Sequence, residues 1–415
     1  MKKFLPVVAT MAAAMLATTA VRAADVEVIH WWTSGGEQAA VTVFANEFDA
    51  LGGDKWIDTA IALGETARAA VMQRALGGDP PEAAQFNPGR QYEELIAAGL
   101  LLDLTPLAEA EGWSDIVRPD TIESSCHIDG KWWCVPVNIH SWQWGWASIP
   151  AFEKVGLAVP KNMDEFIAAA PKLKEAGIIP FAVGGDGGGW QISGMAGVLQ
   201  LNMLGVELRD KIFRDLDTAA AAGPEVTKVF ETVRSLQQYS DDGSVGRNWN
   251  DTTNLVITDA AAFQIMGDWA RGEFSVAGEQ PGVDYECVAG PADKPYLNTG
   301  GDIFVFFKQN DPDVERAQLK LASMMINPRV QALFNNAKGS LPVRDDVDMS
   351  LADACMKKGL ALLADPATVV ADVGQYRTED FNIQMNDLWT DFWFNPETTV
   401  EQAQARFVDL IANAD

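Results

Sequence analysis

The chain has 415 residues, and at roughly 100 to 200 residues per domain this length predicts two or three domains. Hydrophobic residues make up 48% of it and charged residues 21%, which is typical of a globular protein and excludes a disordered or collagen-like chain. The 58 acidic residues outnumber the 31 basic ones and give a net charge of −27, so the surface repels phosphate backbones and nucleic acid is not expected as a partner.

Residues 1–23 predict a cleaved secretory signal. Lys2 and Lys3 precede an apolar run from Phe4 to Ala20, and Val21–Ala23 forms a small-residue cleavage site. The alternative, a membrane-anchoring helix, is disfavoured because the run is short for a span of about 20 apolar residues. We therefore expect a mature protein that begins near Ala24, lies in the periplasm and has no stable membrane insertion.

Strands and helices alternate at the start of the mature chain. β-Branched or apolar runs predict strands, and apolar residues recurring every three or four positions predict helices. The strands are expected over 26–30, 56–63 and 83–86, and the helices over 39–48, 66–76 and 91–98. This alternation favours an α/β sheet with crossover helices.

The chain has four cysteines, and export would make disulfides between them possible. Cys126 and Cys134 flank Asp129-Gly130, which is typical of a hairpin turn, so a cross-strand disulfide fits there. Cys287 and Cys355 would then pair by elimination, although four cysteines allow three connectivities. A metal site is the rival interpretation, but the chain has neither C-x-x-C nor H-E-x-x-H spacing, and we expect no metal and no cofactor.

The rest of the chain predicts a second unit of mixed α and β elements. After Val135–His140, helices are expected around 163–176 and 194–204, and buried strands over 261–266 and 303–307. Polar loops such as Gly267-Asp268 and Gly300–Asp302 adjoin these strands. Ligands of open α/β sheets bind at strand ends, so these loops are the first candidates for a site.

Fourteen tryptophans are many for this length, and most lie in expected loops or strand ends rather than at helical spacing. A pyranose ring presents two apolar faces and a belt of hydroxyls, so its site needs aromatic planes with charged or amide groups around them. Trp32 and Trp269 have glycine and acidic neighbours that favour stacking on a ligand. His140 is either a structural histidine or a donor to a hydroxyl. Trp389 and Trp393, four residues apart, are expected in a helix core.

The chain resembles the periplasmic sugar-binding proteins of ABC importers, in particular their glucose-binding branch. The motifs that carry this resemblance are Ile29–Glu37, Gly77–Pro81, Gly130-Lys131, Val135–Asn138, Phe152–Gly156, Gly267–Trp269, Asn298–Asp302 and Lys338–Arg344. It implies a two-lobed α/β periplasmic binding protein fold with a ligand cleft and a multi-segment hinge. The expected division is 24–137 plus about 297–345 for the first lobe, and 138–296 plus 346–415 for the second.

The resemblance also implies the roles of individual residues. Trp32 and Trp269 would sandwich the sugar ring, Glu37 and Asp302 would accept its hydroxyls, and Lys338 would donate to one. The full set expected to contact the ligand is Trp31, Trp32, Glu37, Gln85, Asn87, Arg90, His140, Trp144, Trp190, Trp249, Trp269, Asn298, Asp302, Lys338 and Gln375.

Two positions depart from the glucose pattern. Asn87 stands where relatives carry a lysine, with Arg90 as a possible replacement, and Gln375 stands where they carry a histidine. The expected function is delivery of a monosaccharide, glucose or a close epimer, to the permease subunits by a monomeric binding protein. A disaccharide or another glycoside is the alternative ligand.

Two other functional classes compete with this interpretation. A glycoside hydrolase would use a carboxylate pair, for which Glu37 and Asp302 are candidates, but the surrounding motifs are those of transport proteins. A scaffolding module would need repeats or exposed apolar patches, which the sequence does not plainly show. We therefore expect a binding protein and not an enzyme.

Overall fold

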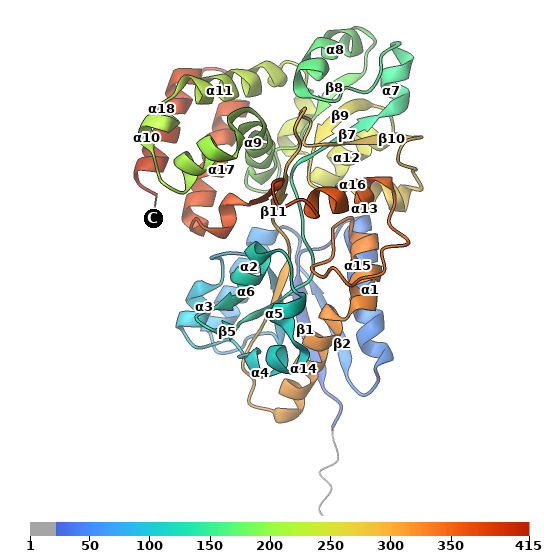
Figure 1. Cartoon of the computed structure of the whole chain (residues 1–415), viewed down its shortest axis with the longest axis vertical. Coiled ribbons are helices and arrows are strands. Elements are labelled where there is room, and N and C mark those ends of the chain that lie inside the picture. The colour runs from blue at the N-terminus through green and yellow to red at the C-terminus, as the bar shows by residue number, and fades with distance from the viewer. Residues whose placement is uncertain (1–21, 415) are drawn as a thin grey trace, which may run out of the picture.

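The computed structural model describes residues 22–414, and almost all of the expected signal segment lies outside them. Two lobes stack along the long axis of the molecule, each built on its own β-sheet (Figure 1). The two-lobed α/β fold expected from the sequence is confirmed. No helix in the described range is both long and apolar enough to span a bilayer.

The first lobe contains a five-stranded sheet in the order β2-β1-β3-β12-β6. β1 is parallel to β2 and β3, whereas β12 is antiparallel to β3 and β6. The strands are β1 (Asp25–His30), β2 (Lys55–Ala60), β3 (Ala83–Phe86), β6 (Cys134–Pro136) and β12 (Ile303–Phe306). β2 ends three residues earlier than expected, because Leu63 adopts a positive φ of 69° and starts the next helix.

Helices cover both faces of this sheet, and a short hairpin lies beside it (Figure 1). They are α1 (Gly35–Ala50), α2 (Gly64–Leu76), α3 (Glu93–Ala97), α4 (Thr105–Glu111), α5 (Trp113–Ile116), α6 (Asp120–Cys126), α14 (Pro312–Ile326) and α15 (Pro328–Lys338), with the hairpin β4 (His127–Ile128) and β5 (Lys131–Trp132). The expected turn at Asp129-Gly130 joins the hairpin strands, and both of its residues have positive φ, as a two-residue hairpin loop requires.

The second lobe contains a four-stranded sheet in the order β10-β7-β9-β8. Its strands are β7 (Trp144–Ser148), β8 (Ile179–Ala182), β9 (Ala261–Ile265) and β10 (Tyr285–Ala289). Its helices are α7 (Ile149–Lys154), α8 (Met163–Glu175), α9 (Trp190–Phe213), α10 (Thr218–Ala221), α11 (Pro224–Gln237), η1 (Asp242–Gly246), α12 (Trp249–Ile257), α13 (Ala270–Ala277), α17 (Glu379–Phe394) and α18 (Val400–Ala412).

Each lobe has a separate hydrophobic core. The first core draws on residues 24–139 and 297–356, and the second on 147–265 and 381–411. Trp389 and Trp393 are buried in the second core, as their spacing predicts. The expected boundaries of the two lobes stay a prediction, since separate cores do not by themselves fix where one unit ends.

Three segments of the chain cross between the lobes: residues 137–143, 290–302 and 339–353. They pair with one another, because His140 forms an antiparallel bridge with Gly300 and Ile139 forms one with Leu341. The second crossing contains β11 (Leu297–Thr299), which is parallel to β13 (Val369–Ala371). The crossing segments therefore form a common connection at the base of the space between the lobes.

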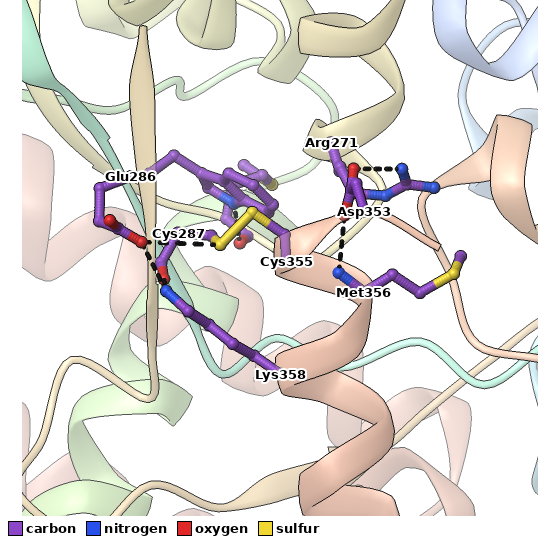
Figure 2. The surroundings of a disulfide bond; sticks show 9 residues. Arg271, Glu286, Cys287, Asp353, Cys355, Met356 and Lys358 are labelled. Carbon is purple, nitrogen blue, oxygen red and sulfur yellow. Dashed lines mark hydrogen bonds and ion pairs between the residues drawn. A yellow bond between two sulfur atoms is a disulfide. The ribbon is translucent and has the colours of Figure 1, made fainter. Parts of the chain in front are cut away.

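Two disulfides are present, and the expected pairing is confirmed. Cys126 bonds Cys134 beside the hairpin, and Cys287 of β10 bonds Cys355 of α16 (Ala354–Leu363). Figure 2 shows the second disulfide, where Lys358 of α16 reaches back to the Cys287 carbonyl oxygen at 2.8 Å. The third crossing segment is thereby fastened to the edge strand of the second sheet.

Candidate functional site

A cavity of about 660 Å³ lies between the lobes, and residues from both lobes and from the crossing segments line it. This volume falls within the range of about 300 to 1,000 Å³ that is usual for small-molecule sites. Twelve of the fifteen residues expected to contact a ligand line this cavity: Trp31, Trp32, Glu37, Asn87, His140, Trp190, Trp249, Trp269, Asn298, Asp302, Lys338 and Gln375.

Three half-buried tryptophans form the aromatic part of the cavity wall in the second lobe. The ring centroid of Trp142 lies 4.8 Å from that of Trp269 and 5.6 Å from that of Trp190. Trp269 and Trp190 are 6.3 Å apart. Trp142 meets both rings at steep angles of 85° and 61°, so the three indoles do not stack on one another and part of their surface faces the cavity.

Trp32 does not offer the open face that the sequence predicted. Its side chain is 1% exposed, with the rings of Phe44, Phe304 and Phe334 at 6.5, 5.6 and 5.3 Å. The Nζ atom of Lys338 lies 5.7 Å from its ring centroid. Trp32 therefore lines the cavity from within the first core, where its ring packs against side chains of α1, α15 and β12.

Glu37 caps the start of α1 with one carboxylate oxygen and contacts Lys338 with the other. Ser34 is the N-cap of α1, and one oxygen of Glu37 accepts hydrogen bonds from the backbone N–H groups of Ser34 and Thr33, both at 3.2 Å. Its other oxygen lies 3.6 Å from Lys338 Nζ. Lys338 is the last residue of α15, where the helix dipole favours a cation. Two helix ends thus place an acid and a base together at the cavity.

His140 joins two carboxylates that come from different parts of the chain. Its Nδ1 lies 2.5 Å from Asp268, which follows β9, and its Nε2 lies 3.1 Å from Asp302, which precedes β12. Asn138 and Gln85 donate to the two oxygens of Asp302 at 2.8 and 2.7 Å. All five side chains are buried, so this network holds the crossing segments in one arrangement.

The charges of this network move the pKa values of its members. Burial lowers the pKa of His140, but the carboxylates of Asp268 and Asp302 outweigh burial and the nearby Lys338, so the pKa lies above its ordinary value. Burial raises the pKa of Asp268. Burial opposes ionisation of Asp302 as well, yet His140 and Lys338 hold the pKa of Asp302 below its ordinary value. The arrangement therefore favours a protonated imidazole beside an ionised Asp302.

Three expected residues do not line the cavity. Gln85 lies behind Asp302, where it also accepts the N–H of Trp31 at 3.0 Å, so it positions the carboxylate. Arg90 instead forms an ion pair at 3.0 Å with Glu93, the first residue of α3. Trp144 is buried in a third cluster beneath α13, because β7 begins at this residue and directs it into the sheet packing.

The remaining expected amides are fixed by the crossing segments. Asn87 donates to the Gly301 carbonyl oxygen at 3.1 Å, and Gln375 donates to that of Thr299 at 2.5 Å. Asn298 accepts from the N–H of Trp142 at 2.8 Å and donates to Asp372 at 2.9 Å. These bonds orient amide groups along the base of the cavity.

The cavity also includes residues that the sequence analysis did not place in it. Arg68 lies over the ring of Trp31 at 5.6 Å and pairs at 2.8 Å with Glu379 of the other lobe. Gln143 and Gln200 line the cavity as well. Trp142 lies in the loop just before β7, and this loop position is the feature of the sequence that could have indicated it. Nothing local in the sequence indicates that α9 and α17 face the cavity.

The side chains that line the cavity can accept hydrogen bonds, donate them and stack on a ligand. Carboxylate and amide oxygens accept hydroxyl protons, Lys338 donates, and indole faces pack against C–H surfaces. Among the residues of the described range, no three His, Cys, Asp or Glu side chains gather in a way that could hold a metal ion. The lining therefore offers the groups that can hydrogen-bond to hydroxyls and pack against C–H surfaces.

Comparisons with known proteins agree with this geometry. Residues 63–359 match the family model of the bacterial extracellular solute-binding proteins. The chain is 39% identical to a probable sugar-binding periplasmic protein of Rhizobium meliloti (strain 1021), covering 89% of this chain and 88% of the relative. It is 38% identical to a protein of the same description from Mesorhizobium japonicum, covering 81% of this chain and 80% of the relative.

Two solved structures share the fold. The bacterial solute receptor AcbH, described as having an exclusive substrate preference for β-D-galactopyranose, superposes with a TM-score of 0.78 at 19% identity, covering 93% of this chain and 98% of the receptor. Maltose-bound MalE3 of T. maritima superposes with a TM-score of 0.74 at 16% identity, covering 94% of this chain and 99% of that protein.

Proposed function

We propose that this chain, which belongs to the bacterial extracellular solute-binding proteins, is the sugar receptor of an ABC importer. It binds a sugar with a glucose-type pyranose ring between its lobes and presents it, as a monomer, to the permease subunits in the membrane. The observation that carries the proposal is a cavity between the lobes that is lined both by indole rings of one lobe and by buried hydrogen-bonding groups of the other.

The periplasmic location expected from the sequence is confirmed by the family and by its sugar-binding periplasmic relatives. The named sugars of the related structures include a galactopyranose and maltose. A glucose-type ring is our inference for this chain from its resemblance to the glucose-binding branch.

The roles of individual residues follow from their positions. Trp269 provides the aromatic surface on which one face of the ring stacks. Glu37 and Asp302 accept hydroxyl protons, Lys338 donates one, and Trp32 supports Lys338 from below. Binding needs no chemical step, because a ligand that contacts both lobes stabilises their closed arrangement by its differential affinity for it.

The test is calorimetric titration of the mature protein with glucose, galactose, mannose and a set of disaccharides. We expect binding, and we expect Trp269→Ala to weaken the tightest sugar by at least about tenfold. Trp133→Ala is the matched control, because Trp133 is a half-buried tryptophan of the first lobe that lies under Lys131 and away from the cavity. Absence of heat with every sugar would overturn the proposal, and an unchanged Kd in Trp269→Ala would overturn the stacking role.

A further inference from the structure

The loop that follows β1 forms part of the cavity wall, and side chains hold its backbone in place. Residues 31–34 all line the cavity. Each of their four backbone N–H groups donates to a side chain: Trp31 to Gln85 at 3.0 Å, Trp32 to His30 at 3.2 Å, and Thr33 and Ser34 to Glu37, both at 3.2 Å. Three side chains therefore determine the shape of this stretch of wall.

His30 differs from the other two acceptors in its surroundings. Glu37 lines the cavity itself, and Gln85 also donates to Asp302 at 2.7 Å. His30 is the last residue of β1, and its side chain is completely buried. Its Nδ1 accepts the N–H of Trp32, while its Nε2 lies 2.8 Å from Oδ1 of Asp58 in β2.

These two contacts determine which nitrogen of the His30 ring carries the proton. A backbone N–H can only donate, so Nδ1 has to be the unprotonated nitrogen that accepts from Trp32. Nε2 then carries the proton and donates it to Asp58. A proton on Nδ1 would set two donors against each other, and the N–H of Trp32 would lose its partner.

Asp58 connects this buried hydrogen bond to the protein surface. Its side chain is 53% exposed, and it also accepts from Nε1 of Trp56 at 3.0 Å. Of the described residues, those that line the cavity include neither His30 nor Asp58. Any effect of this pair on a ligand therefore has to pass through the backbone of Trp32.

We propose that His30, oriented by Asp58, is a positioning residue for sugar binding: it holds the backbone of Trp32, and with it the wall formed by residues 31–34, in the arrangement that the sugar meets. This inference rests on the proposed function, since it assumes that the ligand in the cavity is a sugar. A wall that is already fixed loses little freedom when the ligand binds, which favours affinity.

Calorimetry with the sugar that binds most tightly compares two variants of His30. His30→Asn keeps an oxygen that can accept the N–H two residues ahead, as asparagine does in an Asx-turn, so we expect its Kd to stay within about threefold of the wild type. His30→Phe keeps a ring without an acceptor, and we expect its Kd to rise about tenfold. His127→Phe is the matched control, because His127 is a half-buried histidine of the same lobe that stacks on Trp132 in the hairpin. A wild-type Kd in His30→Phe would overturn the role of His30.

Two variants of Asp58 repeat the comparison at an exposed position, where the fold tolerates a change. Asp58→Ala removes the acceptor that keeps the proton on Nε2 of His30, so we expect the Kd to rise about threefold, whereas Asp58→Asn keeps an oxygen there and should match the wild type. Asp49→Ala is the control, because Asp49 is 40% exposed and accepts the backbone N–H of Trp56 at 3.1 Å, at the other end of β2. An equal rise in Asp49→Ala would mean that loosening β2 is sufficient, and would overturn the role of the pair.

Two measurements on the unliganded protein need no sugar. Long-range ¹H–¹⁵N NMR shows which ring nitrogen carries the proton, and since the chain has three histidines, the signals of His30 are those missing from His30→Asn. We expect a proton on Nε2 alone, and we expect the amide hydrogen of Trp32 to exchange faster in His30→Phe than in the wild type or His30→Asn. A proton on Nδ1, or unchanged exchange in His30→Phe, would overturn the positioning role and leave the proposed function standing. If no sugar binds, the proposed function fails, and these two measurements still decide whether His30 holds Trp32.

Discussion

At the scale of single residues, the polar groups of the cavity hold one another in place. Asp302 accepts from Gln85, Asn138 and His140, and Glu37 uses one oxygen to cap α1. Side chains fixed in this way lose little further freedom when a ligand binds, which favours affinity. The least committed groups are the second oxygen of Glu37 and the ammonium of Lys338, and both face the cavity.

The buried histidine predicts a pH dependence of stability. Because the folded pKa of His140 lies above its usual value of about 6.5, the stabilisation from its ion pairs is complete below about pH 6.5 and is lost as the pH rises through the folded pKa. The neighbouring charges that face the ring are Asp268, Asp302 and Lys338. We expect His140→Asn to be less stable than the wild type in acid and to approach it in alkali.

The measurement is the unfolding temperature of both unliganded proteins between about pH 5.5 and 9. Asn at position 140 stays neutral throughout, so the difference between the two curves isolates the protonation of His140. If the unfolding temperature of the wild type exceeds that of His140→Asn by the same amount at every pH, the prediction is contradicted. If this excess grows with pH, the folded pKa of His140 is lowered.

At the scale of elements, the two disulfides close loops of different lengths. Cys126 and Cys134 are separated by 8 positions, and Cys287 and Cys355 by 68. Loop-closure entropy then gives about 2.5 kcal/mol for the short loop and about 4.4 kcal/mol for the long one. We expect replacement of Cys287 and Cys355 by alanine to lower the urea midpoint more than the same replacement of Cys126 and Cys134.

The two pairs form a matched comparison, because all four cysteines are 2% exposed or less. Loss of the Cys287–Cys355 bond also leaves α16 tied to β10 by fewer contacts, among them the ion pair of Lys358 with Glu286 that Figure 2 shows beside the bond. Tryptophan fluorescence during urea unfolding measures both midpoints. A larger loss in the Cys126 and Cys134 variant would contradict the loop-length argument.

Strands and helices with a clear hydrophobic pattern were predictable from the sequence. Which of their side chains line the cavity was not. The strands over 26–30, 83–86, 261–266 and 303–307 formed close to their expected bounds, since β-branched and apolar runs determine them locally. Trp32 and Trp144 have the same glycine and polar neighbours as cavity residues, yet tertiary packing buries both. The role of α17 depends on its contact with α9, nearly 200 residues earlier, which no local pattern encodes.

At the scale of the whole molecule, the lobes are held together across the cavity. Arg68 of α2 and Gln91, both in the first lobe, each donate at 2.8 Å to Glu379 at the start of α17 in the second. Gly36 of α1 donates at 2.8 Å to Glu273 of α13. Gly36 has to be small there, because a Cβ atom would lie 2.6 Å from the backbone of Gly272. These bonds exist only while the lobes are close.

The bonds to Glu379 predict how closure contributes to affinity. If only the closed arrangement binds tightly, the apparent Kd equals the intrinsic Kd divided by the closed fraction, so breaking a bond of the closed state raises the apparent Kd. Glu379→Gln removes the charge that Arg68 meets while keeping the shape of the side chain. A part-buried ion pair contributes about 1 kcal/mol, so we expect the Kd for the best sugar to rise about fivefold.

Titration calorimetry and small-angle scattering together test this expectation. The unliganded Glu379→Gln protein should have a larger radius of gyration than the wild type, and saturating sugar should bring the two values together. Glu207→Gln is the control, because Glu207 forms its ion pair with Lys211 at 3.0 Å within the same helix, α9, and this pair does not connect the lobes. An unchanged Kd in Glu379→Gln would mean that the bonds between Arg68, Gln91 and Glu379 do not favour the closed form, and the opening would then be governed by the crossing segments around His140.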